Sequence, residues 1–552
     1  MAYWLSDRKR HAWTILAFVV IAEIMTTVMT VRISYWNQHF FNALELKDKA
    51  EVINQIWMGS LVLTGFVIAI MARVVAMYRL KIGWREWLTR TVVADYLKNK
   101  TYHQLNLNAS VIDNPDQRIA IDIKNFTDST PDLALGLFSA VSRTGAFVAV
   151  LWSISPSLTL GSTEIEGYLV YVAVIYAVLA TLITHLLGRK LIPVFNRRER
   201  VEADFRYAAI RLRENSEAIA LSDGEAREER ELRSLFDQIR KNWFDVLKYT
   251  KRVLGFNAMG MQLSQMIPTF AALPAFLSGN MTLGVLMQTR AAFFSVELGF
   301  SWIQTSYTEI AQWKASVDRL MVLKRGIEQA QKEKAQNQIE SVVRSSENVS
   351  LEDIRLSLPD GTELLAVDDF QFRAGENVLL SGPSGSGKTT MFRAMSGLWT
   401  WGRGKVSLTA DDTMFIPQSM YVPIGSLKGA LTYPDSPDSY SDADVQRLMR
   451  LCHLQGHEAD LHREDDWGRI LSGGEKQRAA FVRAMLKRPT WLFMDESTSA
   501  LDPVLEATVM NALVTELPDT TLITIAHRES LKKWHPRWIE IKDGGMNEML
   551  PA

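Results

Sequence analysis

The stretch NVLLSGPSGSGKTT, from Asn377 to Thr390, decides the fold of the second half of this 552-residue chain. A short apolar run leads into a glycine-rich loop that fits the pattern G-x-x-x-x-G-K-[ST]. Backbone N–H groups of such a loop bind phosphate oxygens, the ammonium of Lys388 neutralises their charge, and the Thr389 hydroxyl holds Mg²⁺. We therefore expect a strand, a phosphate loop and a helix. The expected phosphate-binding residues are Gly382, Pro383, Ser384, Gly385, Ser386, Gly387, Lys388, Thr389 and Thr390.

Three further polar side chains follow predicted apolar strands. WLFMDE ends in Asp495, expected to position Mg²⁺ through water, and Glu496, expected to orient and polarise an attacking water. LITIAH ends in His527, which we expect to reach the γ-phosphate, and TMFIPQ ends in Gln418, a third candidate Mg²⁺ ligand beside Thr389 and Asp495. In this order the residues predict hydrolysis of a nucleoside triphosphate.

The segment LSGGEKQR predicts a second place for an anion. Two glycines and a serine stand directly before a charged helix, whose first N–H groups and dipole attract phosphate. The residues concerned are Leu471, Ser472, Gly473, Gly474 and Glu475.

The first half of the chain is apolar enough to enter a membrane. Six stretches of about 20 residues, the length that spans a bilayer, lie at 12–31, 56–77, 133–155, 167–187, 254–278 and 281–303. The net charge of −1 argues against a nucleic-acid surface, and the single cysteine, Cys452, excludes an intrachain disulfide framework and is predicted to be buried.

Loop charge predicts the orientation in the membrane. Loops 155–167 and 278–281 lack Lys and Arg, whereas 188–252 is rich in both. Because basic residues accumulate on the cytoplasmic side, we expect both termini and the soluble half to be cytoplasmic.

Two long connections on that side predict helical arms. Segments 79–103 and 202–243 are rich in helix formers with apolar residues three and four apart. Their tips are predicted at DNPDQRI, Asp113 to Ile119, and LSDGEA, Leu221 to Ala226. The tips are either contact surfaces, carried by Asn114, Asp116, Gly224 and Glu225, or ordinary solvated turns.

Charged residues inside the spans cost a few kcal/mol each and invite a functional interpretation. We expect Glu23, Arg290 and Glu297 to line a hydrated cavity for a polar solute. For Arg73 and Arg143 a structural ion pair or a side chain reaching the interface is an equal alternative. The expected domains are 1–325 in the membrane, a polar linker at 326–348, and 349–552 as the soluble domain.

The soluble half resembles an ATP-binding cassette domain. The resemblance makes Gln418 the Q-loop, Leu471 to Glu475 the signature, Ser499 and Asp502 the D-loop, and His527 the switch. In that family the signature of one subunit closes over the nucleotide held by the other, which implies a second copy of the chain. Most cassettes stack adenine on an aromatic side chain where this chain has Leu358, and Tyr433 resembles the alternative aromatic of subfamily D.

The membrane half is similar to the SbmA/BacA-like permeases, their cassette-bearing YddA-like relatives and the subfamily D half-transporters. The carrying residues are FFNAL (40–44), WREWLT (84–89), NPDQRI (114–119), GYLVYVAVIYA (167–177), EADFRY (202–207) and ENSEAIAL (214–221). The resemblance implies an α-helical membrane domain of six transmembrane helices with the ABC exporter-type fold, fused to an α/β P-loop ABC nucleotide-binding domain. It places the chain in a bacterial inner membrane.

These features together predict an ATP-driven homodimer that uses ATP and Mg²⁺ to move a hydrophilic solute, such as a peptide, peptide antibiotic or cobalamin-like compound. One alternative is a proton-coupled permease with a regulatory cassette, because SbmA-like relatives lack a cassette. Another is a transporter of acyl-CoA or lipid-like substrates. A soluble cassette protein acting on nucleic acid is excluded by the six apolar stretches.

Overall fold

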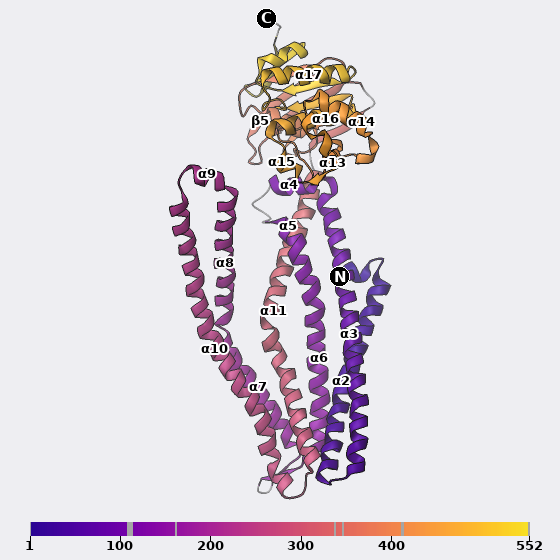
Figure 1. The fold of residues 1–552 in the computed structure, drawn as a ribbon, viewed down its shortest axis with the longest axis vertical. Coiled ribbons are helices and arrows are strands. Elements are labelled where there is room, and N and C mark those ends of the chain that lie inside the picture. The colour runs from indigo at the N-terminus through magenta and orange to yellow at the C-terminus, as the bar shows by residue number, and fades with distance from the viewer. Residues whose placement is uncertain are drawn as a thin grey trace. The chain divides into compact units, whose positions relative to one another are not determined.

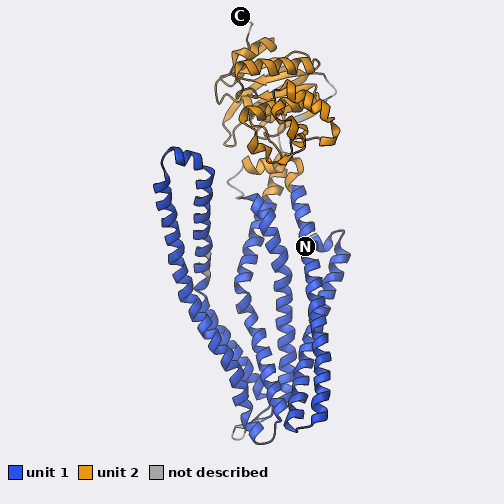
Figure 2. Ribbon diagram, viewed as in Figure 1, with its two compact units in different colours: residues 1–95, 112–325 blue, residues 96–111, 326–552 orange. Residues whose placement is uncertain are grey.

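The computed structural model describes residues 2–107, 114–160, 163–335, 338–344, 347–409 and 413–549. They form two compact units (Figure 2). Unit 1 comprises Met1–Asp95 and Ile112–Arg325, and unit 2 comprises Tyr96–Val111 and Gly326–Ala552.

Unit 1 is built from helices, most of them long (Figure 1). They are α1 (Ala2–Leu5), α2 (Lys9–Glu45), α3 (Lys49–Leu97), α5 (Pro115–Gln117), α6 (Ile123–Ile154), α7 (Tyr168–Gly188), α8 (Leu191–Glu214), α9 (Ser216–Leu221), α10 (Glu225–Leu277) and α11 (Leu283–Ala335). A π-helical turn, η2 (Arg118–Asp122), precedes α6, and the hairpin β1 (Leu158–Leu160) and β2 (Thr163–Ile165) precedes α7. The ends of α3 and α11 continue into unit 2.

Four helical stretches of the described chain are long and apolar enough to cross a membrane. They are Lys9–Glu45, Lys49–Leu107, Pro115–Ile154 and Tyr168–Glu214, and they cover the first four predicted spans to within one residue. The fifth and sixth predicted spans lie in α10 and α11, each 53 residues long. The count of six therefore stays a prediction.

Close helix contacts hold unit 1 together. A Cβ added at Gly299 of α11 would lie 1.8 Å from Oγ1 of Thr144 on α6, so these helices approach as closely as glycine allows. The Tyr176 hydroxyl on α7 donates to the carbonyl of Gly260 on α10 at 2.6 Å. These contacts satisfy polar groups in apolar surroundings and fix the helices in register.

A buried carboxylate joins η2 to α11, outside the predicted spans. Asp122 is 1% exposed. Its two oxygens accept from Nε and Nη2 of Arg319 at 2.8 and 2.5 Å, and Oδ1 also accepts from the Ser316 hydroxyl at 3.1 Å. Burial raises the pKa of this carboxyl, but the bonds from Arg319 and Ser316 and the charge of Arg118 outweigh it and hold the pKa below its ordinary value.

Both predicted arms are helical. In the second arm α8 and α10 run side by side with α9 between them at the tip (Figure 1), and the turn at 222–224 lies within the predicted tip. In the first arm, α3 is followed by η1 (Lys98–Lys100) and α4 (Thr101–Leu107), which the sequence analysis did not separate. Within the predicted tip, Asn114 has a positive φ of 48° and Pro115 opens α5; Asp113 lies outside the described residues.

Unit 2 contains an α/β domain with two main sheets. The larger sheet has the order β14-β13-β6-β12-β11-β8 and is parallel except for β14. Its strands are β6 (Val378–Ser381), β8 (Thr413–Ile416), β11 (Trp491–Asp495), β12 (Thr521–Ile525), β13 (Arg537–Lys542) and β14 (Gly545–Met549). The smaller sheet has the order β3-β7-β4-β5, with β3 (Gln338–Arg344), β4 (Val349–Ser357), β5 (Glu363–Phe372) and β7 (Gly402–Thr409).

Short helices and a two-stranded pair complete this domain. They are α12 (Lys388–Met395), β9 (Gly425–Ser426), α13 (Leu427–Thr432), η3 (Pro437–Ser439), α14 (Asp442–Leu451), η4 (Gln455–Asp460), β10 (Glu464–Asp465), α15 (Trp467–Ile470), α16 (Gly473–Lys487), α17 (Pro503–Glu516) and η5 (Glu529–Trp534).

Strand periodicity explains the two cores of the domain. Along β11, Trp491 and Phe493 face the core shared with α12 and the smaller sheet, whereas Leu492 and Met494 face the core formed with α14, α16 and α17. Cys452 is fully buried in the latter core, as predicted, and burial raises the pKa of its thiol to about 12. A strand covered on both faces must be apolar throughout, which is why WLFM precedes the acidic pair.

Strand β3 lies in the segment that the sequence analysis assigned to a linker. Ile339 is 5% exposed and packs in the core, and β3 pairs with β7 in parallel over seven residues, Gln338 to Arg344. The run IESVV contains three β-branched residues but does not alternate between apolar and polar residues, and charged residues surround it, so its sequence did not indicate a strand.

Candidate functional site

The phosphate loop is the predicted strand, loop and helix start. Strand β6 ends at Ser381, and α12 begins at Lys388 after Gly387, whose φ is +94°. A Cβ added at Gly382, where φ is +144°, would lie 2.2 Å from the carbonyl oxygen of Ile541. Only glycine allows this approach, because a side chain at this position would clash with Ile541. The loop leads into the start of α12, where backbone N–H groups can bind phosphate.

Lys388 is held over this loop. Its Nζ donates to the carbonyls of Gly382 and Pro383 at 2.8 and 2.6 Å, and the residue is only 6% exposed. Burial lowers the pKa of its ammonium, which the carboxylates of Glu496 and Asp495 only partly oppose. The positive charge of Lys388 therefore lies at the phosphate loop, where it would stabilise bound phosphate oxygens.

The end of β11 supplies the acidic pair. Asp495 is 7% exposed and accepts a hydrogen bond from the Thr389 hydroxyl. Burial raises the pKa of this carboxyl, Glu496 raises it further, and the bond from Thr389 acts in the opposite direction. A buried carboxylate beside a hydroxyl at a phosphate loop is a donor set that fits Mg²⁺.

The carboxylate of Glu496 contacts side chains from two distant parts of the chain. Its Oε2 accepts from Nε2 of Gln418 at 2.9 Å, and its Oε1 lies 3.5 Å from Nε2 of His527. Its backbone has a φ of +47°, uncommon for a residue with a side chain. The parallel neighbours β8, β11 and β12 end at one edge of the sheet, which brings these side chains together.

The signature residues begin α16. Ser472 is the N-cap and forms a capping box with Glu475: its backbone N–H and hydroxyl donate to Glu475 Oε2 at 2.9 and 2.7 Å. The other oxygen, Oε1, lies 3.0 Å from Nε2 of His457. Burial raises the pKa of Glu475, but the bonds from Ser472 and His457 outweigh it and lower the pKa to about 2. Leu471 is 3% exposed and packs in the core, while Gly473 and Gly474 start the helix.

The D-loop is held by residues that the sequence analysis did not single out. Asp502 caps α17 by accepting from the N–H groups of Val504 and Leu505. Nε2 of Gln477 donates to the Ser499 hydroxyl at 3.0 Å, and Nη2 of Arg528 donates to the Ser499 carbonyl at 2.9 Å. Position was the only available signal: Gln477 lies in LSGGEKQR, and Arg528 directly follows His527.

The two candidates for contact with adenine lie in different surroundings. The Tyr433 ring is 43% exposed, lies 5.5 Å from the ring of Tyr421, and has the guanidinium of Arg483 over it at 5.2 Å. Leu358 closes the turn between β4 and β5 by donating its N–H to the carbonyl of Thr362. Neither role in binding adenine is tested by these contacts.

The charged residues of the predicted cavity are not gathered into one cluster by any ion pair among the described residues. Glu23 is fully buried and its Oε2 pairs with Nη1 of Arg73 at 2.5 Å, the ion-pair alternative for Arg73. Nη2 of Arg290 donates to Gln265 at 3.4 Å, and Oε2 of Glu297 is buried without a hydrogen-bond partner among the described residues. Glu23 therefore faces Arg73 in this conformation.

At the predicted tips, Asn114 and Asp116 lie at the start of α5, and Gly224 and Glu225 lie at the start of α10. The end of the first arm also contributes to unit 2. Nζ of Lys100 donates to the Ser396 carbonyl at 3.0 Å, and Leu107 packs against the core beside α12. Helix α4 therefore belongs with the phosphate-loop helix.

The similarity of this chain to known proteins identifies its family. The family model described as ABC transporter transmembrane region 2 matches residues 1–277, and the model described as ABC transporter matches residues 365–499. The chain belongs to the ABC transporter family. It is a multi-pass membrane protein of the bacterial inner membrane that couples ATP hydrolysis to transport.

Relatives of this ABC transporter are similar to it over nearly its whole length. It is 31% identical to the inner membrane ABC transporter ATP-binding protein YddA of Escherichia coli (strain K12), covering 95% of this chain and 93% of the relative. It is 29% identical to ABC transporter D family member 2, chloroplastic, of Arabidopsis thaliana, covering 98% and 84%. The recognised relationship to YddA-like proteins and subfamily D is thus confirmed.

A solved structure confirms the exporter fold. The structure of a bacterial Atm1-family ABC exporter with ATP bound matches with a TM-score of 0.75, covering 98% of this chain and 95% of that one at 17% identity. One transmembrane region and one cassette match the chain, which is the composition of a half-transporter.

Proposed function

We propose that this half-transporter forms a homodimer in which ATP hydrolysis, with Mg²⁺ held by Thr389, Gln418 and Asp495, drives a hydrophilic solute through the membrane by alternating access. The observation that carries the proposal is the convergence of Gln418 and His527 on the carboxylate of Glu496. A regulatory cassette has no need of this assembled hydrolytic group.

The chain's residues divide the chemistry between them. The N–H groups of the phosphate loop and the ammonium of Lys388 stabilise negative charge on the phosphates, and Glu496 accepts a hydrogen bond from the attacking water and orients it. We expect His527 to donate a hydrogen bond to the γ-phosphate. Mg²⁺, when bound, neutralises charge on the β- and γ-phosphate oxygens.

The position of the signature supports a second copy. Among the described residues, no hydrogen bond or ion pair joins residues 471–475 to the phosphate loop at 382–390 of the same chain. We assign the Ser472 hydroxyl and the first N–H groups of α16 to a phosphate that another subunit holds, as the resemblance to ATP-binding cassettes implies. An identical partner supplies two such sites.

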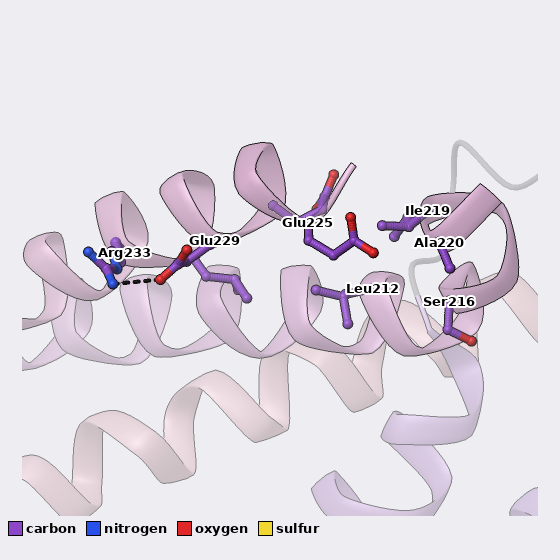
Figure 3. Close-up of a pocket in the computed structure, with 9 residues that line it drawn as sticks. Leu212, Ser216, Ile219, Ala220, Glu225, Glu229 and Arg233 are labelled. Carbon is purple, nitrogen blue, oxygen red and sulfur yellow. Dashed lines mark hydrogen bonds and ion pairs between the residues drawn. The ribbon is translucent and has the colours of Figure 1, made fainter. Parts of the chain in front are cut away.

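The second arm supplies an apolar surface for that partner. Figure 3 shows a groove of about 360 Å³ at its tip, which is lined by Leu212, Ser216, Ile219, Ala220, Glu225, Glu229 and Arg233. Further along, Phe236, Trp243, Phe244 and Leu247 are more than half exposed. This surface lies among many charged residues beyond the predicted spans, so lipid does not cover it, and we assign it to a second copy of the chain.

The solute is proposed to be hydrophilic because charges lie within the spans. Arg290 and Glu297 are seven residues apart on α11, hence on one helix face. Charged side chains that are retained despite the cost of membrane insertion are more readily explained by a watery path than by a lipid groove. Peptides, peptide antibiotics and cobalamin-like compounds are the candidates.

Sealed vesicles that contain the purified protein test this function. Transport should require hydrolysable ATP, stop in Glu496→Gln, and continue when a protonophore collapses the pH gradient. Transport that continues in Glu496→Gln and stops with the protonophore would instead identify a proton-coupled permease.

A further inference from the structure

Gln477 connects three parts of the cassette through one side-chain amide. It lies in the second turn of α16 and is 8% exposed. Its Nε2 lies 3.0 Å from the Ser499 hydroxyl and 3.4 Å from the Glu496 carbonyl, and its Oε1 accepts from the N–H of Ala500 at 2.9 Å. The donor and the acceptor of the amide are both used.

The segment that Gln477 contacts is the catalytic loop, residues 496–502, which follows β11. On its other side this loop is held by Arg528, which donates to the carbonyls of Ser499 and Leu501 at 2.9 and 2.7 Å. The Arg528 guanidinium is in turn anchored on Glu506, which is 1% exposed. The loop is therefore clamped between α16 and the residue after His527.

Helix α16 also fits closely against this loop. A Cβ added at Gly474 would lie 3.3 Å from the carbonyl oxygen of Ala500, which is tighter than ordinary contact. The signature at the start of α16 and the loop that carries Glu496 thus lie in direct contact within one subunit. A shift of either moves the other, because packed elements transmit displacement.

We propose that Gln477 is a positioning residue that links the two ATP sites of the dimer. This inference rests on the proposed function, in which the signature of each subunit completes the site of the other. Glu496 then acts on the nucleotide of its own subunit, whereas the helix that bears Gln477 contacts the nucleotide of the partner. One amide joins the chemistry of one site to phosphate binding at the other.

A dimer with one working site separates the two ends of this link. A wild-type subunit paired with a Glu496→Gln subunit retains one intact site, made from the wild-type catalytic loop and the signature of the Glu496→Gln subunit. Gln477→Leu is then added to either subunit. In the wild-type subunit this change alters the catalytic side of the working site. In the Glu496→Gln subunit it alters the signature side of the same site.

We expect either placement to lower kcat for ATP by about fivefold or more, with binding of a fluorescent ATP analogue to the phosphate loop unchanged. Loss from only one placement overturns the link and leaves Gln477 serving a single site. Lys487→Gln, at the exposed end of α16, is the control and should leave turnover unchanged. If Gln477→Leu does not fold, Gln477→Glu replaces it, because it keeps the acceptor for Ala500 and loses the donor.

A second measurement decides the case in which the mixed dimer is inactive. In the Glu496→Gln homodimer, Gln477→Leu should raise the ATP concentration needed to trap nucleotide by severalfold, and unchanged trapping overturns the proposal. Failure of the proposed function looks different. There, a mixed dimer of Lys388→Ala and Ser472→Arg subunits would show no ATPase activity above either parent, because no site would be shared.

Discussion

At the scale of single residues, the site depends on groups whose neighbours fix their charge and direction. Glu496 is the clearest case, since Gln418 and His527 meet on its carboxylate. The neutral amide of Glu496→Gln keeps the shape but loses the acceptor for a water proton. We expect ATP binding to persist while steady-state hydrolysis falls about 100-fold or more. Phosphate release at saturating ATP measures it, and near-normal turnover would contradict the role of Glu496.

The pKa of Glu475 predicts a pH dependence of stability. Its folded-state value is about 2, against an ordinary value of 4.5. A carboxylate with a depressed pKa stabilises the fold above its unfolded pKa, and this contribution is lost as pH falls through the folded value. Between about pH 4.5 and 2, the wild type should therefore lose more stability than Glu475→Gln.

Thermal unfolding of the detergent-solubilised protein, followed by tryptophan fluorescence, measures this difference. The exposed carboxylate variant Glu464→Gln is the control and should follow the wild type. Identical acid sensitivity of wild type and Glu475→Gln would show that the capping box contributes nothing to the profile.

Sequence reasoning at this scale identified the strand ends and helix starts that carry local motifs, namely the phosphate loop, the acidic pair and the helix start at Ser472. The roles of these residues toward ATP stay predictions. Gln477 and Arg528 were missed because they bind mainly backbone groups of another segment, and a backbone carbonyl leaves no mark in the sequence. The pairing of Glu23 with Arg73 likewise depends on the relative register of α2 and α3.

At the scale of elements, the ion pair of Asp122 and Arg319 joins η2 to α11. Removing Arg319 leaves a buried carboxylate with much of its compensation lost. Arg319→Ala should therefore lower the free energy of unfolding by about 3 kcal/mol, the low end for a broken buried pair because the side chain of Arg319 is 39% exposed.

Denaturant titration of the purified protein tests this estimate. The exposed pair of Arg90 and Glu86 on α3 provides a matched control, since Arg90→Ala should leave the free energy of unfolding nearly unchanged. Replacing both Asp122 and Arg319 by alanine should cost less than the two single changes added together. A cost of Arg319→Ala equal to that of the control would rule out a structural role for the pair.

Element existence was largely predicted, because helices in the arms and strands around the phosphate loop carry clear periodicity. Strand β3 was not. Its pairing with β7 joins residues 338–344 to 403–409, and a partner so far along the chain cannot be identified from the composition of one segment.

At the scale of the whole molecule, the proposed dimer should be visible in mixed subunits. Lys388→Ala removes the phosphate-loop ammonium, and Ser472→Arg blocks the signature. A dimer of one subunit of each kind keeps one intact composite site, made from the loop of the Ser472→Arg subunit and the signature of the Lys388→Ala subunit.

Co-purification through two different affinity tags isolates that mixed dimer for ATPase assay. Its activity should exceed that of either parent homodimer. No recovery above the parents would contradict shared sites, whatever the mechanism within each cassette.

The seven-residue strand β3 bears on where this protein can be divided. It forms the edge of the smaller sheet and covers one side of β7. A fragment that starts at Val349 would leave the N–H and C=O groups of β7 open to other molecules, a known route to aggregation. A fragment that starts at Gly326 would keep them paired. Light scattering should find the longer fragment monodisperse and the shorter one self-associated. Strand β3, which follows α11, would then protect the sheet from edge-to-edge association.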